Sequence, residues 1–135
     1  MSTGHVLTNE EKVVWQKRIM DICIQALTYK SFHLLCYFIQ QLYEYCVACE
    51  CKENNKPIKL KLLSNVYLEN SWSSFCYKLY GLRNYTTHNN YIRHDFTAVL
   101  EDKNYNLLIE RYFNRDDWKY LKLLRLYYTD CLQEV

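Results

Sequence analysis

Glycine and proline are almost missing from this chain: its 135 residues include two glycines and one proline. Tight turns between β-strands depend on these residue types, so their scarcity argues against a sheet and favours long helices with few connections. We therefore expect an all-α fold, a four- to five-helix up-and-down bundle. A chain of this length predicts a single helical domain over residues 1–135, with residues 1–8 as a flexible N-terminal tail.

Long apolar runs are also missing. Half of the residues are hydrophobic, yet no run approaches the roughly 18 apolar residues that cross a membrane. The longest candidate, residues 32–39, contains His33 and is followed by two glutamines. Residues 1–12 are polar and acidic, unlike a signal peptide. The sequence therefore predicts a cytoplasmic protein with no membrane partner.

The seven cysteines are an odd number, and in a reducing compartment we expect most of them to be small buried hydrophobic residues. Cys46, Cys49 and Cys51 resemble half of a zinc site. A closed site needs four ligands, and the only other candidates nearby are Cys36 and His33. Because Cys46 and Cys49 also fit the apolar face of a helix, we expect neither a metal nor a cofactor.

The net charge of +2 is small, but its distribution is uneven. Residues 1–57 carry six basic and six acidic side chains, and residues 101–135 carry six basic and seven acidic ones. Residues 58–100, called here the basic segment, contain Lys59, Lys61, Lys78, Arg83 and Arg93 against Glu69 and Asp95. A local positive excess attracts a polyanion such as RNA.

Two helices are predicted in the N-terminal part. Thr8 and Glu11 have the spacing of a capping box, which predicts a helix that runs to about Thr28. Ser31 is placed to cap a second helix, whose apolar stripe is broad enough for a central position. The expected core residues are Val14, Ile19, Ile22, Cys23, Ala26 and Leu27, then Leu34, Leu35, Phe38, Ile39, Leu42, Tyr45, Cys46 and Cys49.

The middle of the chain is less regular. Residues 52–57 are polar and end in the single proline, which predicts a loop. For residues 58–69 a short helix and an extended linker both stay open. Asn70 or Ser71 then caps a helix in which Gly81 costs about 1 kcal/mol against alanine, a cost that either close packing or room for a substrate would explain. Its apolar face contains Trp72, Phe75, Cys76, Leu79 and Leu82.

Three shorter helical stretches follow. Asp95 is placed to cap the first, an interruption covers residues 102–106, and the second covers residues 107–112. Asn114 is placed to cap the last helix. The expected core residues of the first and last stretches are Phe96, Val99, Leu100, Trp118, Leu121, Leu124, Leu126 and Tyr128.

The residues with the clearest chemistry are Arg83 and His88. An arginine has a permanent positive charge and a rigid fork of donors that suits a phosphate, and a histidine gives or takes a proton near neutral pH. On a continuous helix this spacing leaves the two side chains roughly 140° apart. The β-branched residues 86–87 and the turn-forming residues 89–90 favour a break near His88, which would let the imidazole approach Arg83.

The pattern Arg83-Asn84-Tyr85-Thr86-Thr87-His88, preceded by Leu-Tyr-Gly-Leu in a small all-helical chain, resembles the HEPN family. The resemblance implies a helical bundle that dimerises and acts as a metal-independent ribonuclease in toxin–antitoxin or phage-defence (abortive infection) systems. Arg83 and His88 of both copies would share one cleft. The implied partners are RNA, a second copy of the chain, and an antitoxin or other regulatory protein.

The resemblance also implies supporting roles around this pair. Asn84 stands where the family often has a polar residue that orients the arginine or the substrate. Tyr91 follows His88 by three residues, near a tyrosine that is modified in one branch of the family, and a packing role is equally open. Arg93 can extend a phosphate-binding surface together with Lys78, although the Arg93 region is also typical of a loop and helix cap.

Two other functions stay open. A catalytically silent HEPN-like module would bind RNA, a nucleotide or a protein through the same groove. An unrelated helical interaction protein of a virus or mobile element would dock through a tyrosine-rich face. The fourteen tyrosines are spread over the whole chain, so we expect most of them to lie in the core or at interfaces rather than to stack on bases.

Overall fold

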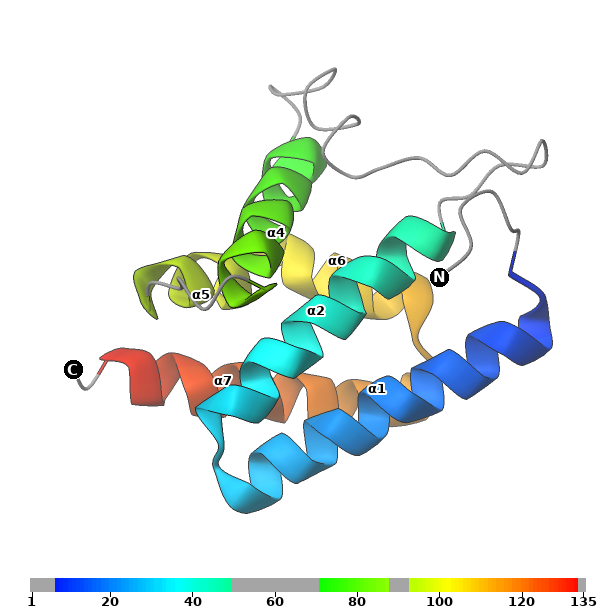
Figure 1. Cartoon of the computed structure of the whole chain (residues 1–135), viewed down its shortest axis with the longest axis horizontal. Helices are drawn as coiled ribbons and strands as arrows, with labels where there is room; N and C mark the ends of the chain where they lie inside the picture. Colours follow the sequence, from blue (N-terminus) through cyan, green and yellow to red (C-terminus); the bar gives the residue numbers. More distant parts are fainter. Residues whose placement is uncertain (1–6, 50–70, 88–92, 134–135) are drawn as a thin grey trace.

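The computed structural model describes residues 7–49, 71–87 and 93–133 (Figure 1). This part of the chain is helical and contains no strand, which confirms the all-α prediction. It holds six α-helices, not four to five. They are α1 (Asn9–Tyr29), α2 (Phe32–Cys49), α4 (Ser71–Thr87), α5 (Arg93–Leu100), α6 (Lys103–Tyr112) and α7 (Trp118–Gln133), with one 3-10 turn, η1 (Arg115–Asp117). Residues 52–57 and 58–69 lie outside the described residues.

Helix α1 begins with the predicted capping box. The backbone N–H of Glu11 donates to Thr8 Oγ1 over 3.1 Å, and the backbone N–H of Thr8 donates to Glu11 Oε1 over 3.0 Å. These bonds give acceptors to two backbone N–H groups that have none within the helix. Leu7, directly before the cap, is 6% exposed and belongs to the core. Leu7 therefore packs in the core and Thr8 caps α1, although the prediction included both in the tail.

The α1–α2 connection is short and fixed by hydrogen bonds. Lys30 adopts the left-handed conformation that ends many helices. Ser31 Oγ accepts from the backbone N–H of Leu34 over 3.3 Å, as the predicted cap requires. The hydroxyl of Tyr128 in α7 lies 2.6 Å from the carbonyl oxygen of Ser31 and 3.0 Å from that of Ala26. These contacts link α7 to the connection between α1 and α2.

The helices pack as a closed ring around one core (Figure 1). Helix α2 packs between α1 and α4, α4 packs on α5 and α6, and both of these contact α7, which returns to α1. The face of α4 predicted to be apolar is buried through Phe75, Cys76, Leu79 and Leu82. No helix within the described ranges is long and apolar enough to cross a membrane.

Several predicted boundaries and core positions were wrong. Helix α5 starts before Asp95, which lies in its first turn instead of capping it. The interruption shrinks to residues 101–102, because Asp102 caps α6 four residues earlier than expected. Val14 and Leu126 are 52% and 53% exposed. At Val14 the reason is that Trp15, one position on, turns towards α2 and packs on Tyr45.

The short helices α5 and α6 bring the number of α-helices in the described residues to six. With 8 and 10 residues they extend about 12 Å and 15 Å, whereas the 21 residues of α1 extend about 31 Å. The sequence predicts both as separate short stretches, and α6 begins four residues earlier than expected. Tyr105 links α6 to α7, because its buried hydroxyl donates to the carbonyl of Leu121 over 3.1 Å.

Candidate functional site

Arg83 lies near the C-terminal end of α4 and faces α2. Its Nη1 donates to Asn84 Oδ1 over 3.2 Å. Its Nη2 lies 3.5 Å from Glu44 Oε1 on α2. The side chains of Arg83 and Glu44 are 32% and 43% exposed, so both are accessible to solvent. The guanidinium is therefore held between a neutral acceptor and a carboxylate at the protein surface.

Two tyrosines form the inner side of this site. The guanidinium carbon of Arg83 lies 5.7 Å from the ring centroid of Tyr43, a cation–π contact, and the rings of Tyr43 and Tyr80 are 5.9 Å apart. Burial raises the pKa of Tyr43 to about 12, although the charge of Arg83 opposes the shift. Tyr43 is therefore neutral at physiological pH and contacts Arg83 through its ring.

The second predicted catalytic residue, His88, lies outside the described residues. Helix α4 is described as far as Thr87, the residue immediately before it. Tyr91 also lies outside the described residues. Arg93 begins α5, but its side chain is not among those that the structure describes. The predicted meeting of Arg83 and His88 therefore stays a prediction.

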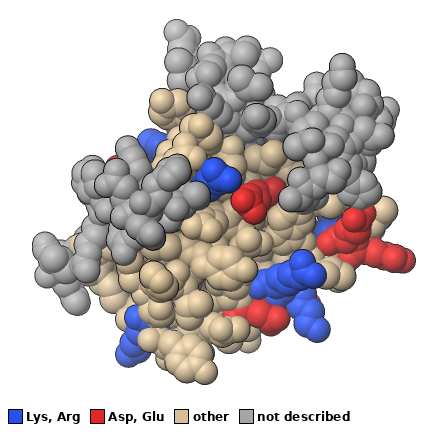
Figure 2. All heavy atoms as spheres, in the orientation of Figure 1, with Lys and Arg blue, Asp and Glu red and all other residues tan. Residues whose placement is uncertain are grey.

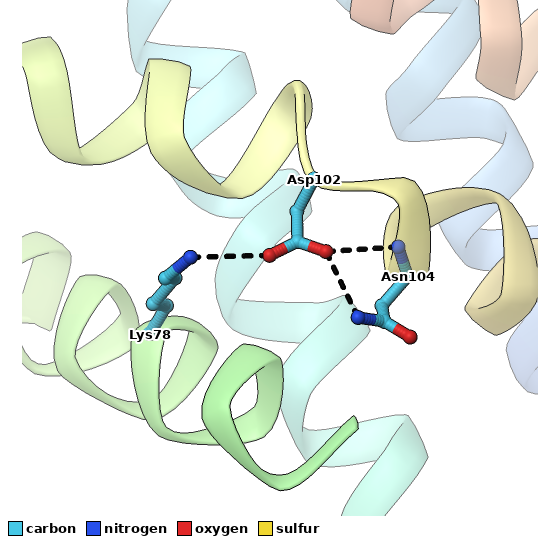
Figure 3. Close-up of polar contacts among 3 residues, drawn as sticks. All are labelled: Lys78, Asp102 and Asn104. Atoms are coloured by element: carbon cyan, nitrogen blue, oxygen red, sulfur yellow. Dashed lines mark hydrogen bonds and ion pairs between the residues drawn. The ribbon is translucent and has the colours of Figure 1, made fainter. Parts of the chain in front are cut away.

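Lys78, another predicted substrate-binding residue, contacts the start of α6 (Figure 3). Its Nζ lies 3.1 Å from Asp102 Oδ2. The other oxygen, Oδ1, accepts from the backbone N–H and the side-chain amide of Asn104, each over 2.9 Å. Burial alone would raise the pKa of Asp102, but these donors lower it below its ordinary value of 3.8. Lys78 thus contributes to a helix cap.

Among the side chains that the structure describes, the basic segment contributes two cations, and both have acidic partners. Its two basic side chains that the structure describes, Lys78 and Arg83, each contact a carboxylate from outside the segment. On the face shown in Figure 2, blue and red atoms are interspersed among tan ones over the described residues. Over the described residues, Arg83 therefore lies in an environment of mixed charge.

Gly81 lies within two residues of Arg83 on the same helix. A Cβ added at Gly81 would have no neighbouring heavy atom within 4 Å. Close approach of another described helix, one of the two explanations for this glycine, is therefore wrong. Open space beside the helix is what the other explanation, room for a substrate, requires.

The cysteines give no metal centre in the described part of the chain. Cys46 is buried in α2 and Cys49 is half-buried at its end, as expected for core positions. The described ranges contain no group of three or more His, Cys, Asp or Glu side chains placed to hold a metal ion. Cys51, the third residue of the predicted half-site, lies outside them.

Glu44, Tyr43 and Tyr80 were not predicted as site residues. Glu44 had a usable signal, since it is the only Asp, Glu, Lys or Arg in α2. A single charge in an otherwise uncharged helix of a packed bundle calls for a partner or a function. The tyrosines had no such signal, because they repeat the apolar spacing of the core.

Comparison of the chain with protein-family models, with curated proteins and with solved structures finds no significant match.

Proposed function

We propose that this protein is a metal-independent endoribonuclease of HEPN type, with Arg83 and His88 as its catalytic residues. The observation that carries the proposal is the surface position of the Arg83 guanidinium, held on one side by Asn84 and backed by the ring of Tyr43. A guanidinium fixed in this way presents preorganised charge, which is the requirement for stabilising a phosphoryl transition state.

In this proposal His88 deprotonates the ribose 2′-hydroxyl or protonates the leaving 5′-oxygen. Arg83 stabilises the negative charge that develops on the pentacoordinate phosphorus. The 2′-oxygen attacks phosphorus as the bond to the 5′-oxygen breaks, so the products are a 2′,3′-cyclic phosphate and a 5′-hydroxyl. DNA is not cleaved because it lacks the nucleophile.

The proposal includes two protein partners. Two copies of the chain form a homodimer in which both Arg83–His88 pairs line one cleft, and an antitoxin or other regulatory protein holds the enzyme inactive until defence requires it. The all-helical architecture is compatible with this class of assembly.

The test is incubation of total RNA with the purified protein in excess chelator, followed by analysis of the RNA ends. We expect cyclic phosphates from the wild type and at least a hundredfold slower cleavage by His88→Ala. His33→Ala is the matched control, because His33 is exposed at the start of α2, and it should cleave like the wild type. Equal cleavage by the wild type and His88→Ala would contradict the proposal.

A second function is supported by the contact between Arg83 and Glu44. An arginine paired with a carboxylate between two helices is also typical of a packing role. In that case the protein is a catalytically silent module that binds RNA, a nucleotide or a protein beside α4. RNA bound by the wild type without turnover, and bound equally by His88→Ala, would select this function over the first.

A further inference from the structure

We propose that Glu44 controls access of the substrate phosphate to Arg83, by occupying the guanidinium until a phosphate displaces it. This inference rests on the proposed function, since it assigns a role to a residue beside the same arginine. The starting observation is that Glu44 Oε1 lies 3.5 Å from Arg83 Nη2 and comes from a different helix.

Glu44 contacts one of the two terminal nitrogens of the guanidinium, Nη2. The Nε atom of Arg83 is buried, so an anion reaches the group only at Nη1 and Nη2. Asn84 Oδ1 already accepts from Nη1. A phosphate oxygen that binds the terminal nitrogens therefore comes within a few ångströms of the Glu44 carboxylate, and the two negative charges repel.

The contact is weak enough to be displaced. Strong charge-assisted N–H···O bonds are about 2.7–2.9 Å long, well below the 3.5 Å seen here. The Glu44 side chain is 43% exposed, so it can turn into solvent at little cost. The Lys78–Asp102 contact on the same helix is shorter, at 3.1 Å, and its carboxylate is only 14% exposed.

Arg83 does not depend on Glu44 for its position. Asn84 and the ring of Tyr43 contact the guanidinium from α4 and α2 respectively. Removing the charge of Glu44 therefore leaves the arginine held and takes away the competing anion. The consequence is selectivity: a single small anion competes poorly with Glu44, whereas an RNA strand that also contacts neighbouring groups displaces it.

The experiment compares Glu44→Gln with Glu110→Gln, which removes the same charge from an exposed position on α6. Inorganic phosphate is titrated into each protein, and the Arg83 Nε–H signal is followed by NMR. We expect Glu44→Gln to bind phosphate roughly tenfold more tightly than the wild type, because one nearby negative charge is removed. Glu110→Gln should bind like the wild type.

A double variant tests whether the gain in phosphate affinity depends on Arg83. Phosphate protection against thermal unfolding reports binding in variants that lack the arginine. Glu44→Gln combined with Arg83→Ala should bind phosphate no better than Arg83→Ala alone. A gain that persists without Arg83, or equal affinities for Glu44→Gln and Glu110→Gln, would overturn the inference.

RNA cleavage is measured separately with the same proteins. Its absence in the wild type overturns the proposed ribonuclease, whereas the ratio of phosphate affinities alone decides the role of Glu44. If Glu44→Gln binds phosphate more weakly than the wild type, Glu44 positions Arg83 instead of competing for it, and the inference is wrong. Glu44→Ala serves as a second variant without a hydrogen-bonding side chain.

Discussion

Helix α4 carries two charged residues, Lys78 and Arg83, and each reaches a carboxylate on another helix or at its cap. The two ion pairs differ in length and in how far the carboxylate is buried. Asp102, the partner of Lys78, is largely buried and caps α6 through Asn104, which is itself 2% exposed. Glu44, the partner of Arg83, is half-exposed and 3.5 Å away.

The Lys78–Asp102 pair is part of a fixed helix cap, whereas the Arg83–Glu44 pair is not. Every oxygen of the Asp102 carboxylate accepts a hydrogen bond in a fixed arrangement, so displacing its lysine would disturb the start of a helix (Figure 3). Arg83 instead has a loosely held partner and an aromatic ring behind it. Of two basic residues that look alike in the sequence, only Arg83 has a carboxylate partner that is itself half-exposed and not part of a helix cap.

The largest expected effect concerns cleavage of RNA. Arg83→Ala should lower the cleavage rate at least a hundredfold, because it removes preorganised positive charge from the transition state. Lys78→Ala should change the rate by no more than about threefold, since Lys78 contacts the α6 cap and not the site. The measurement is the initial rate on one RNA substrate, with thermal unfolding to establish that both variants are folded.

Equal losses in these two variants would remove the distinction between the ion pairs. A large loss in Lys78→Ala alone would move the candidate site towards the start of α6. Arg83→Lys is the conservative companion, and partial activity is expected because lysine keeps the charge but loses the planar fork.

For stability, the larger effect is expected at the Lys78–Asp102 pair and the smaller one at the Arg83–Glu44 pair. Asp102→Ala should lower the free energy of unfolding by about 2 kcal/mol, because it removes a helix cap and the hydrogen bond that Asp102 accepts from the buried amide of Asn104. Glu44→Ala should lower it by at most about 0.5 kcal/mol, as for other exposed ion pairs. Urea unfolding near neutral pH measures both, and a larger loss in Glu44→Ala would contradict the assignment.

Much of this fold could be predicted because its determinants are local. The capping box at Thr8 and the cap at Ser31 involve residues three positions apart, and the apolar face of α4 follows one helical period. The start of α6 was missed although its cap is local, with Asp102 Oδ1 accepting from the backbone N–H of Asn104. Another error arose where two helices meet. Val14 was misplaced because the exposure of a position depends on where a neighbouring helix packs.

The site was less predictable for the same reason. Arg83 and Asn84 are adjacent, so their pairing followed from position, but Glu44 lies 39 residues before Arg83 and Asp102 lies 24 residues after Lys78. Charge counted along the sequence made 58–100 a basic segment. In the folded chain, carboxylates from outside that segment contact both of its described cations, and only the tertiary arrangement determines that.

The smallest effect is the pH dependence that the Lys78–Asp102 pair adds to stability. The pKa of Asp102 is lowered in the folded state, so near pH 4 the unfolded chain binds more protons than the folded one. This stabilisation is present above the unfolded pKa and is lost as the pH falls through the folded pKa. Asp102→Asn should therefore lose less stability than the wild type between about pH 6 and about pH 3.

Asp117 provides a control of opposite sign. Burial, with a contribution from Asp116, raises its pKa, so the folded state binds a proton before the unfolded chain does and gains stability as the pH falls. Asp117→Asn should therefore lose more stability than the wild type over the same range. Urea unfolding at both pH values measures the three proteins. If both variants shift in the same direction, the cap around Asp102 does not hold its carboxylate ionised, and the contrast with the open Arg83–Glu44 pair is lost.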